Sequence, residues 1–197
     1  MEIKKFLFKV AKQSNKIIIN NFTLNMDKEW KTDGTPLTES DLKINELFIN
    51  SVKKYFPQHG ILAEEGGNIK SLSEYTWLCD PVDGTIPFSL GIPTCVFAAC
   101  LLKNGEPIVT IIADPFFNRY FYAEKGKGAY LNNIAIHVSQ TASLEKQIFG
   151  TLAWTTAKYD LKSLPEKLVN NNLHIINTGS TINMGTLVAS GNLIGIA

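Results

Sequence analysis

Two short apolar runs in this chain each end in carboxylates, and this arrangement limits the folds open to the chain more than any other feature. Residues 76–79 favour a buried β-strand, which is expected to end at Asp80 because Pro81 cannot continue the ladder. Residues 61–63 predict a second strand, followed directly by the Glu64–Glu65 pair. Adjacent like charges are costly unless a cation offsets them. The sequence therefore predicts a cation site where strands end.

The residues after Asp80 supply further oxygen ligands. The stretch from Asp80 to Asp83 is expected to form one tight turn, so that both carboxylates and the Val82 carbonyl face one point. Hard divalent cations bind such oxygens, and Mg²⁺ keeps positions for water and substrate phosphate. Gly84 permits a close backbone approach, and Thr85 can orient a water. Alone, this string also fits an ordinary turn, but the Glu pair favours a magnesium site for phosphate-ester hydrolysis.

Apolar periodicity predicts the other elements. Helices are expected over about 3–18 and from about 41 to 55, where the segment 38–41 starts the second helix and Pro57 ends it. Further expectations are strands at 94–102, 107–113, 119–123, 128–131 and 174–176, a hairpin turn at Asn104-Gly105, helical character over 152–171 and a late helix after Gly179. Helices followed by a strand-rich stretch indicate the α+β class.

These motifs together resemble the lithium-sensitive, magnesium-dependent phosphatase superfamily, and most closely its inositol monophosphatase-like branch. The resemblance is carried by Asp41, then Glu64–Glu65, then the segment 80–85, in that order. Segments 31–41 and 123–132 are also similar to recurrent family segments, so the resemblance extends over nearly the whole chain. Histidinol-phosphatase-like proteins are close relatives of this branch.

The resemblance implies the layered αβαβα sugar-phosphatase fold. Family members run longer and carry a Trp-Asp segment whose Asp completes the second metal site, whereas this sequence stops at the apolar residues 194–197. We therefore expect a single domain over 1–197 that lacks its final C-terminal elements. Its N-terminal α+β half is expected at about 1–113, and its C-terminal α/β half is expected to start at about 114.

The resemblance also implies metal ligands. Glu64, Asp80 and the Val82 carbonyl would hold the first Mg²⁺, and Asp80 and Asp83 would hold the second. Glu64 would also reach a third, weaker ion through water. Two or three Mg²⁺ ions and inhibition by Li⁺ are therefore expected.

Catalytic and substrate contacts follow from the same resemblance. Thr85, helped by Glu65 or Asp41, would position the attacking water, and the amides of Gly84 and Thr85 would meet phosphate oxygens. Substrate-binding residues would be Asp83, Gly84, Thr85, Gly179, Ser180 and Thr181, the last three lying in a turn where family members hold substrate hydroxyls. From the residues alone, Ser180 and Thr181 fit equally well as caps of the late helix.

The expected activity is Mg²⁺-dependent hydrolysis of a small phosphorylated alcohol such as inositol monophosphate, through a metal-activated water. The alcohol stays open, because segments 33–41 and 64–67 lean towards histidinol-phosphatase-like relatives, whereas 91–93 and 125–129 fit the inositol monophosphatase branch equally well. A phosphatase of histidinol phosphate or of a 3′-nucleotide bisphosphate is an alternative. An inactive metal-binding fragment or scaffold subunit is the alternative from another class.

Composition agrees with a cytoplasmic enzyme. With 45% hydrophobic residues, 19% charged residues and a net charge of +1, the chain can bury a sizeable core and gives no electrostatic reason to expect nucleic acid or an anionic membrane as a partner. Three cysteines in apolar runs, without a secretory signal, indicate reduced core thiols. The three histidines have no partner pattern and are expected to be structural. By resemblance, a homodimer is also expected.

Overall fold

The computed structural model describes residues 1–32, 34–141, 143–152 and 163–197. Two amphipathic helices open the chain, α1 (Ile3–Asn21) and α2 (Glu39–Tyr55). A short hairpin of β1 (Glu29–Trp30) and β2 (Pro36–Leu37) joins them. The start of α2 is fixed by a capping box, in which Thr38 and Asp41 bond each other's backbone and side chain. Both predicted helices are confirmed.

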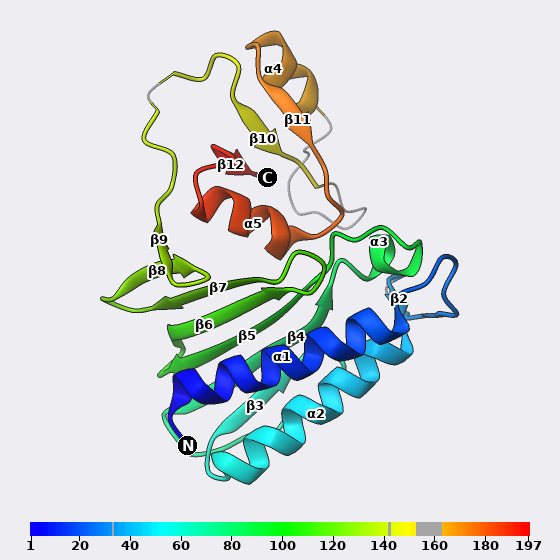
Figure 1. Ribbon diagram of the computed structural model, residues 1–197, viewed down its shortest axis with the longest axis vertical. Coiled ribbons are helices and arrows are strands. Elements are labelled where there is room, and N and C mark those ends of the chain that lie inside the picture. Colours follow the sequence, from blue (N-terminus) through cyan, green and yellow to red (C-terminus); the bar gives the residue numbers. More distant parts are fainter. Residues whose placement is uncertain (33, 142, 153–162) are drawn as a thin grey trace.

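A seven-stranded sheet lies against these helices, which cover one of its faces (Figure 1). Its strands, in spatial order, are β3 (Gly60–Ala63), β4 (Tyr75–Asp83), β5 (Val96–Lys103), β6 (Glu106–Asp114), β7 (Arg119–Glu124), β8 (Gly128–Leu131) and β9 (Ile134–Ile136). The β3–β4 pair is parallel and the others are antiparallel. The predicted hairpin turn is confirmed, since Asn104 and Gly105 both have positive φ.

Aromatic rings between the sheet and the helices form the centre of the core. Trp77 of β4 is fully buried, and its ring centroid lies 5.0 Å from that of Phe6 and 5.2 Å from that of Phe56. Its indole N–H donates to Nδ1 of His59 at 3.1 Å, so this histidine has the structural role expected of it. The three cysteines are free thiols, and Cys79 and Cys95 are buried.

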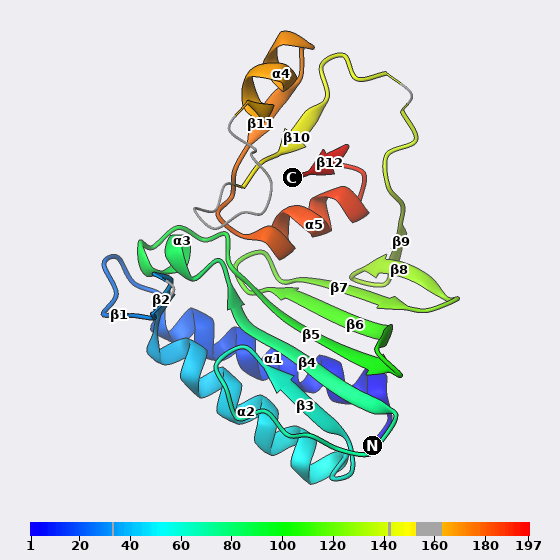
Figure 2. The ribbon, with the colours of Figure 1, turned by 180° about the vertical axis from the view of Figure 1, so that it is seen from behind.

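A second, parallel sheet lies on the other side of α5 (Thr181–Ala189), as both views show (Figures 1 and 2). Its order is β11-β10-β12, with bounds His174–Ile176, Ile148–Gly150 and Gly195–Ile196. The short helix α4 (Leu164–Asn170) lies beyond it. The layers therefore follow the predicted αβαβα order. Part of the helical region expected over 152–171 falls on 153–162, which lie outside the described residues.

Pro81 was expected to end its strand, and this is wrong: β4 continues to Asp83. The division into halves near 113 stays a prediction, and the seven-stranded sheet itself runs across that point from β6 to β9.

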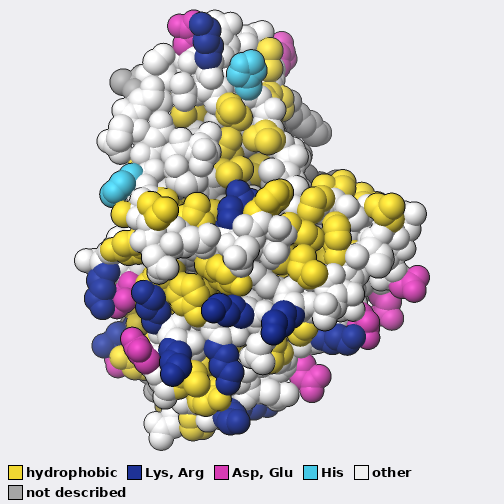
Figure 3. Space-filling model, viewed as in Figure 1, with side chains coloured by type: hydrophobic (Ala, Val, Ile, Leu, Met, Phe, Trp, Pro, Cys, Tyr) yellow, Lys and Arg dark blue, Asp and Glu magenta, His cyan; other side chains and the backbone are white. Residues whose placement is uncertain are grey.

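Lysine side chains are spread over the outer face of α1 and α2 (Figure 3). Lys4 and Lys9 lie over the rings of Tyr122 and Tyr55, at 4.9 and 5.1 Å from the centroids. This face therefore has the character of a solvated surface. Within the part of the chain that the structure describes, no helix has the length and apolar character needed to cross a membrane.

Candidate functional site

The two acidic groups meet because their strands are parallel neighbours. Ala63 of β3 pairs with Cys79 of β4, so Glu64 and Asp80 follow at the same edge of the sheet. The Glu64 amide donates to the Cys79 carbonyl at 3.1 Å, which extends the ladder by one step. The side-chain amide of Asn45, on α2, donates to the carbonyl of Gly66 at 3.2 Å and holds the loop after Glu64. The structure thus brings together the two carboxylate groups that the sequence predicts at two strand ends.

A β-bulge, and not the expected tight turn, sets the spacing of Asp80 and Asp83. Asp80 pairs with Ala98 and Asp83 pairs with Val96, so β4 has one residue more than β5 over this interval. Pro81 lies in the bulge, where its missing N–H costs no ladder bond. The extra residue re-aims the side chains that follow it, which places Asp83 towards α5.

Asp80 is the most perturbed carboxyl group of the site. Its Oδ1 is buried and has no hydrogen-bond partner among the described residues. Burial, followed by the nearby charges of Glu64 and Asp83, raises the pKa of Asp80 to about 9. A buried carboxylate oxygen without a donor is costly, and a bound cation would both satisfy it and restore its charge. The donor set therefore fits a hard divalent cation.

The Thr85 hydroxyl lies between two oxygens at the start of α3 (Thr85–Ser89). It donates to the Val82 carbonyl at 2.9 Å and lies 3.4 Å from Asp41 Oδ1. Asp41 is buried, and burial raises its pKa to about 6 despite the opposing hydrogen bonds from Thr38. Asp41 therefore has two roles: one oxygen caps α2, and the other faces Thr85.

Lys31 lies against the Glu64–Glu65 pair, a contact that the sequence motifs did not predict. Its ammonium lies 3.0 Å from Glu64 Oε1 and 2.6 Å from Glu65 Oε1, and the Glu65 side chain is only 5% exposed. Burial alone would lower the pKa of Lys31, but the two glutamates raise it well above its ordinary value. Part of the cationic charge that the Glu64–Glu65 pair requires is thus supplied by the chain. The only sequence signal was its place in the family-like segment 31–41.

Asp83 is held by the N-terminus of α5. Its Oδ2 accepts from the Ser180 hydroxyl and from the Ile182 amide, the latter at 2.8 Å. Ser180 is fully buried, and its hydroxyl also accepts from the Asn183 amide at 3.1 Å, as an N-cap does. The single proton of that hydroxyl is therefore directed to Asp83. Thr181 is the exposed first residue of the helix.

Comparison with known proteins now decides the family. The inositol monophosphatase family model matches residues 1–196. The chain belongs to the inositol monophosphatase family. It is 33% identical over 165 residues to inositol monophosphatase 1 of Solanum lycopersicum, a match that covers 82% of this chain and 60% of that protein. It is 32% identical over 133 residues to Nus factor SuhB of Vibrio cholerae, covering 67% of this chain and 45% of that protein.

Solved structures confirm the family fold. The IMPase of Thermotoga maritima superposes with a TM-score of 0.88 at 28% identity, and the match covers 98% of this chain and 74% of that one. The chain spans roughly half the length of the curated relatives it matches. Its matches cover between 44% and 60% of three of these relatives.

Glu64 lies beside Asp80, whereas the Asp83 carboxylate is bonded to the N-terminus of α5. Among the described residues, no three His, Cys, Asp or Glu side chains are already gathered at metal-ligand spacing. An open groove of about 760 Å³ begins at Glu64 and Asp80 and continues along β3 to β6. Its walls are mainly apolar and include Leu62, Leu78, Ala98, Cys100 and Ile182. The groove gives a small molecule access to the acidic edge.

Proposed function

We propose that this chain is a Mg²⁺-dependent phosphomonoesterase, acting on a small phosphorylated alcohol such as inositol monophosphate. The observation that carries the proposal is the buried Oδ1 of Asp80 beside Glu64, which has no hydrogen-bond partner in the described part of the chain and lies at the strand edge where the groove opens. Membership of the inositol monophosphatase family supports the same reaction class. The proposal applies to the chain as given, which covers only part of the length of its relatives.

The acidic edge supplies the ligands. Glu64, Asp80 and the Val82 carbonyl would hold one Mg²⁺, and Asp80 and Asp83 would hold another. When bound, Mg²⁺ lowers the pKa of water and offsets the charge of a phosphate. Asp80 is suited to bridge the two positions because it is buried and the charges of both Glu64 and Asp83 act on it.

The chain's own groups would then handle the proton. Thr85 can orient a water through its hydroxyl. Asp41 can accept the hydroxyl proton when the hydroxyl turns from the Val82 carbonyl to Asp41 Oδ1, since the Asp41 pKa of about 6 leaves it mostly ionised at neutral pH. Glu65 is ion-paired with Lys31, so it would act by fixing Lys31 and Glu64. The amides of Gly84 and Thr85 are the proposed phosphate contacts.

Phosphate release tests the proposal directly. The substrates are inositol 1-phosphate, histidinol phosphate and adenosine 3′,5′-bisphosphate, each with Mg²⁺, with and without Li⁺. Li⁺-inhibited release from one of them would support the proposal and identify the alcohol. No release from any substrate, with Mg²⁺ binding intact, would contradict it in favour of the inactive metal-binding alternative.

Thr85→Ala is expected to slow the chemistry and to spare metal binding. Because Thr85 contacts the carbonyl and Asp41 through its hydroxyl alone, its removal should lower kcat by about 100-fold or more while Mg²⁺ affinity stays within about threefold. Rate measurements beside Mg²⁺ titration check this, with Thr85→Ser, which keeps the hydroxyl, as the matched control. Turnover of the alanine variant close to that of the wild type would exclude the role.

A further inference from the structure

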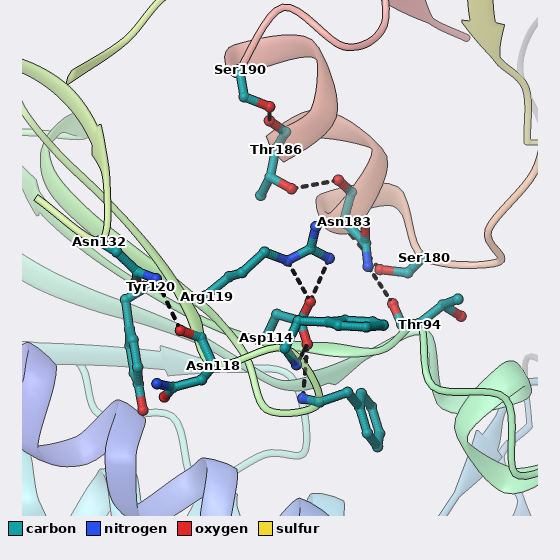
Figure 4. A network of polar contacts seen from close by, with 12 residues as sticks. Thr94, Asp114, Asn118, Arg119, Tyr120, Asn132, Ser180, Asn183, Thr186 and Ser190 are labelled. Atoms are coloured by element: carbon teal, nitrogen blue, oxygen red, sulfur yellow. Dashed lines mark hydrogen bonds and ion pairs between the residues drawn. The ribbon is translucent and has the colours of Figure 1, made fainter. Parts of the chain in front are cut away.

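A polar network joins the beginning of α5 to the segment between α3 and β5 (Figure 4). The Asn183 side-chain amide donates to the Thr94 carbonyl at 2.7 Å. The Thr94 hydroxyl donates to the Thr178 carbonyl, also at 2.7 Å. These bonds join residues more than eighty positions apart in the sequence. They fix the N-terminus of α5 relative to the acidic edge without using the Asp83 side chain.

Close backbone packing reinforces this placement. Gly84 has a φ of +92°, and a Cβ on it would lie 2.8 Å from the Ser180 Cβ. Gly179 has a φ of +73°, and a Cβ there would lie 3.0 Å from Pro87. Such contacts exclude larger side chains, so Ser180 is held directly against the residue that follows Asp83.

We propose that Ser180 is a positioning residue for Asp83, which sets the orientation of this carboxylate for the cation. The Ser180 hydroxyl and the Ile182 N–H both bond Oδ2, so the carboxylate plane is fixed and Oδ1 is the oxygen that these donors leave for another partner. This inference rests on the proposed function. It assigns Ser180 a role other than contact with substrate, because its only proton is used by Asp83.

The physical advantage is pre-organisation. A free aspartate must lose rotamer freedom when it binds a cation, whereas Asp83 is already ordered. The Ser180 hydroxyl and the Ile182 N–H both donate to the Asp83 carboxylate, and such bonds favour its charged form. The positive end of the helix dipole acts in the same direction. These donors thus keep the buried Asp83 carboxylate oriented for a cation.

The competing explanation is that Ser180 only caps α5, and matched variants separate the two. Ser180→Ala removes both functions, Ser180→Thr keeps the hydroxyl, and Ser180→Gly removes the hydroxyl at a smaller cost in capping. Ser190→Ala is the control. It also removes a partly buried hydroxyl, which donates to the Thr186 carbonyl from the C-cap position at the opposite end of α5. Each variant is measured by Mg²⁺ titration calorimetry, by thermal unfolding without metal, and by kcat and KM.

We expect Ser180→Ala and Ser180→Gly to weaken Mg²⁺ binding by about 10-fold or more, the effect typical of groups that orient metal ligands. Ser180→Thr should recover affinity to within about threefold, and Ser190→Ala should leave it unchanged. Wild-type Mg²⁺ affinity in the folded glycine or alanine variant would overturn the inference, as would an equal loss in Ser190→Ala. Asp80→Asn separates a failure of the positioning role from a failure of the proposed metal site. If Asp80→Asn also leaves Mg²⁺ binding unchanged, the proposed metal site is wrong. If Asp80→Asn weakens binding and the Ser180 variants do not, only the positioning role is wrong.

Discussion

Asp80→Asn is expected to abolish phosphate release and to weaken Mg²⁺ binding by more than about 100-fold, since loss of groups that merely orient metal ligands already costs 10–100-fold. The substitution keeps the shape of the side chain and one oxygen but removes the charge. The Asp80 carboxylate has a buried oxygen without a hydrogen-bond partner among the residues that the structure describes, and Asp80 is proposed to bridge both metal positions. Binding and turnover should therefore be lost together.

Phosphate release and Mg²⁺ titration calorimetry on the same preparation measure this result. The exposed Asp27 offers a matched control, because Asp27→Asn makes the same chemical change away from the acidic edge. Normal turnover of Asp80→Asn would contradict the metal site. Loss of turnover with unchanged Mg²⁺ affinity would place Asp80 in the chemistry but outside the cation site.

The parts of this protein that follow local rules could be predicted from its sequence. Apolar residues at helical spacing and the Thr38–Asp41 capping box specify α1 and α2, and Asn104-Gly105 specifies its hairpin. The acidic edge could be predicted because each carboxylate group directly follows a strand-like run, and β3 and β4 pair in parallel. In these places local preference and tertiary structure agree.

The parts that depend on contacts distant in sequence could not be predicted. Proline is excluded from regular ladders but tolerated in bulges, so Pro81 did not end β4 once the pairing with β5 gained an extra residue. Lys31 reaches Glu64 across 33 positions, and Ser180 reaches Asp83 across 97. No local pattern encodes such pairs. Strands β10 and β12 are too short to show an alternating pattern, although the equally short apolar run of β11 does predict a strand at 174–176.

Without metal, the protein is expected to lose stability as the pH rises from about 7 to about 9. Asp80 has a pKa raised to about 9 in the folded state, whereas an unfolded aspartate ionises near 3.8. Between these values the folded state binds more protons than the unfolded state, so the free energy of unfolding falls with pH, by up to about 1.4 kcal/mol per unit for one proton. Asp41 adds to the loss only at lower pH, since its pKa is about 6.

Thermal unfolding in EDTA across this range measures the effect, and Asp80→Asn isolates it. The buried thiol of Cys95 also has a raised pKa and contributes a slope of the same sign in both proteins, whereas the raised pKa of Cys79 is partly an effect of the Asp80 charge itself. The difference between the two curves therefore belongs to Asp80. The variant should have the shallower curve and exceed the wild type in stability at the alkaline end. Saturating Mg²⁺ should reverse that order, because a cation holds Asp80 ionised in the folded state and stabilises only the wild type. Parallel curves in EDTA would show that Asp80 ionises without cost, and the electrostatic basis of the proposed cation site would be lost.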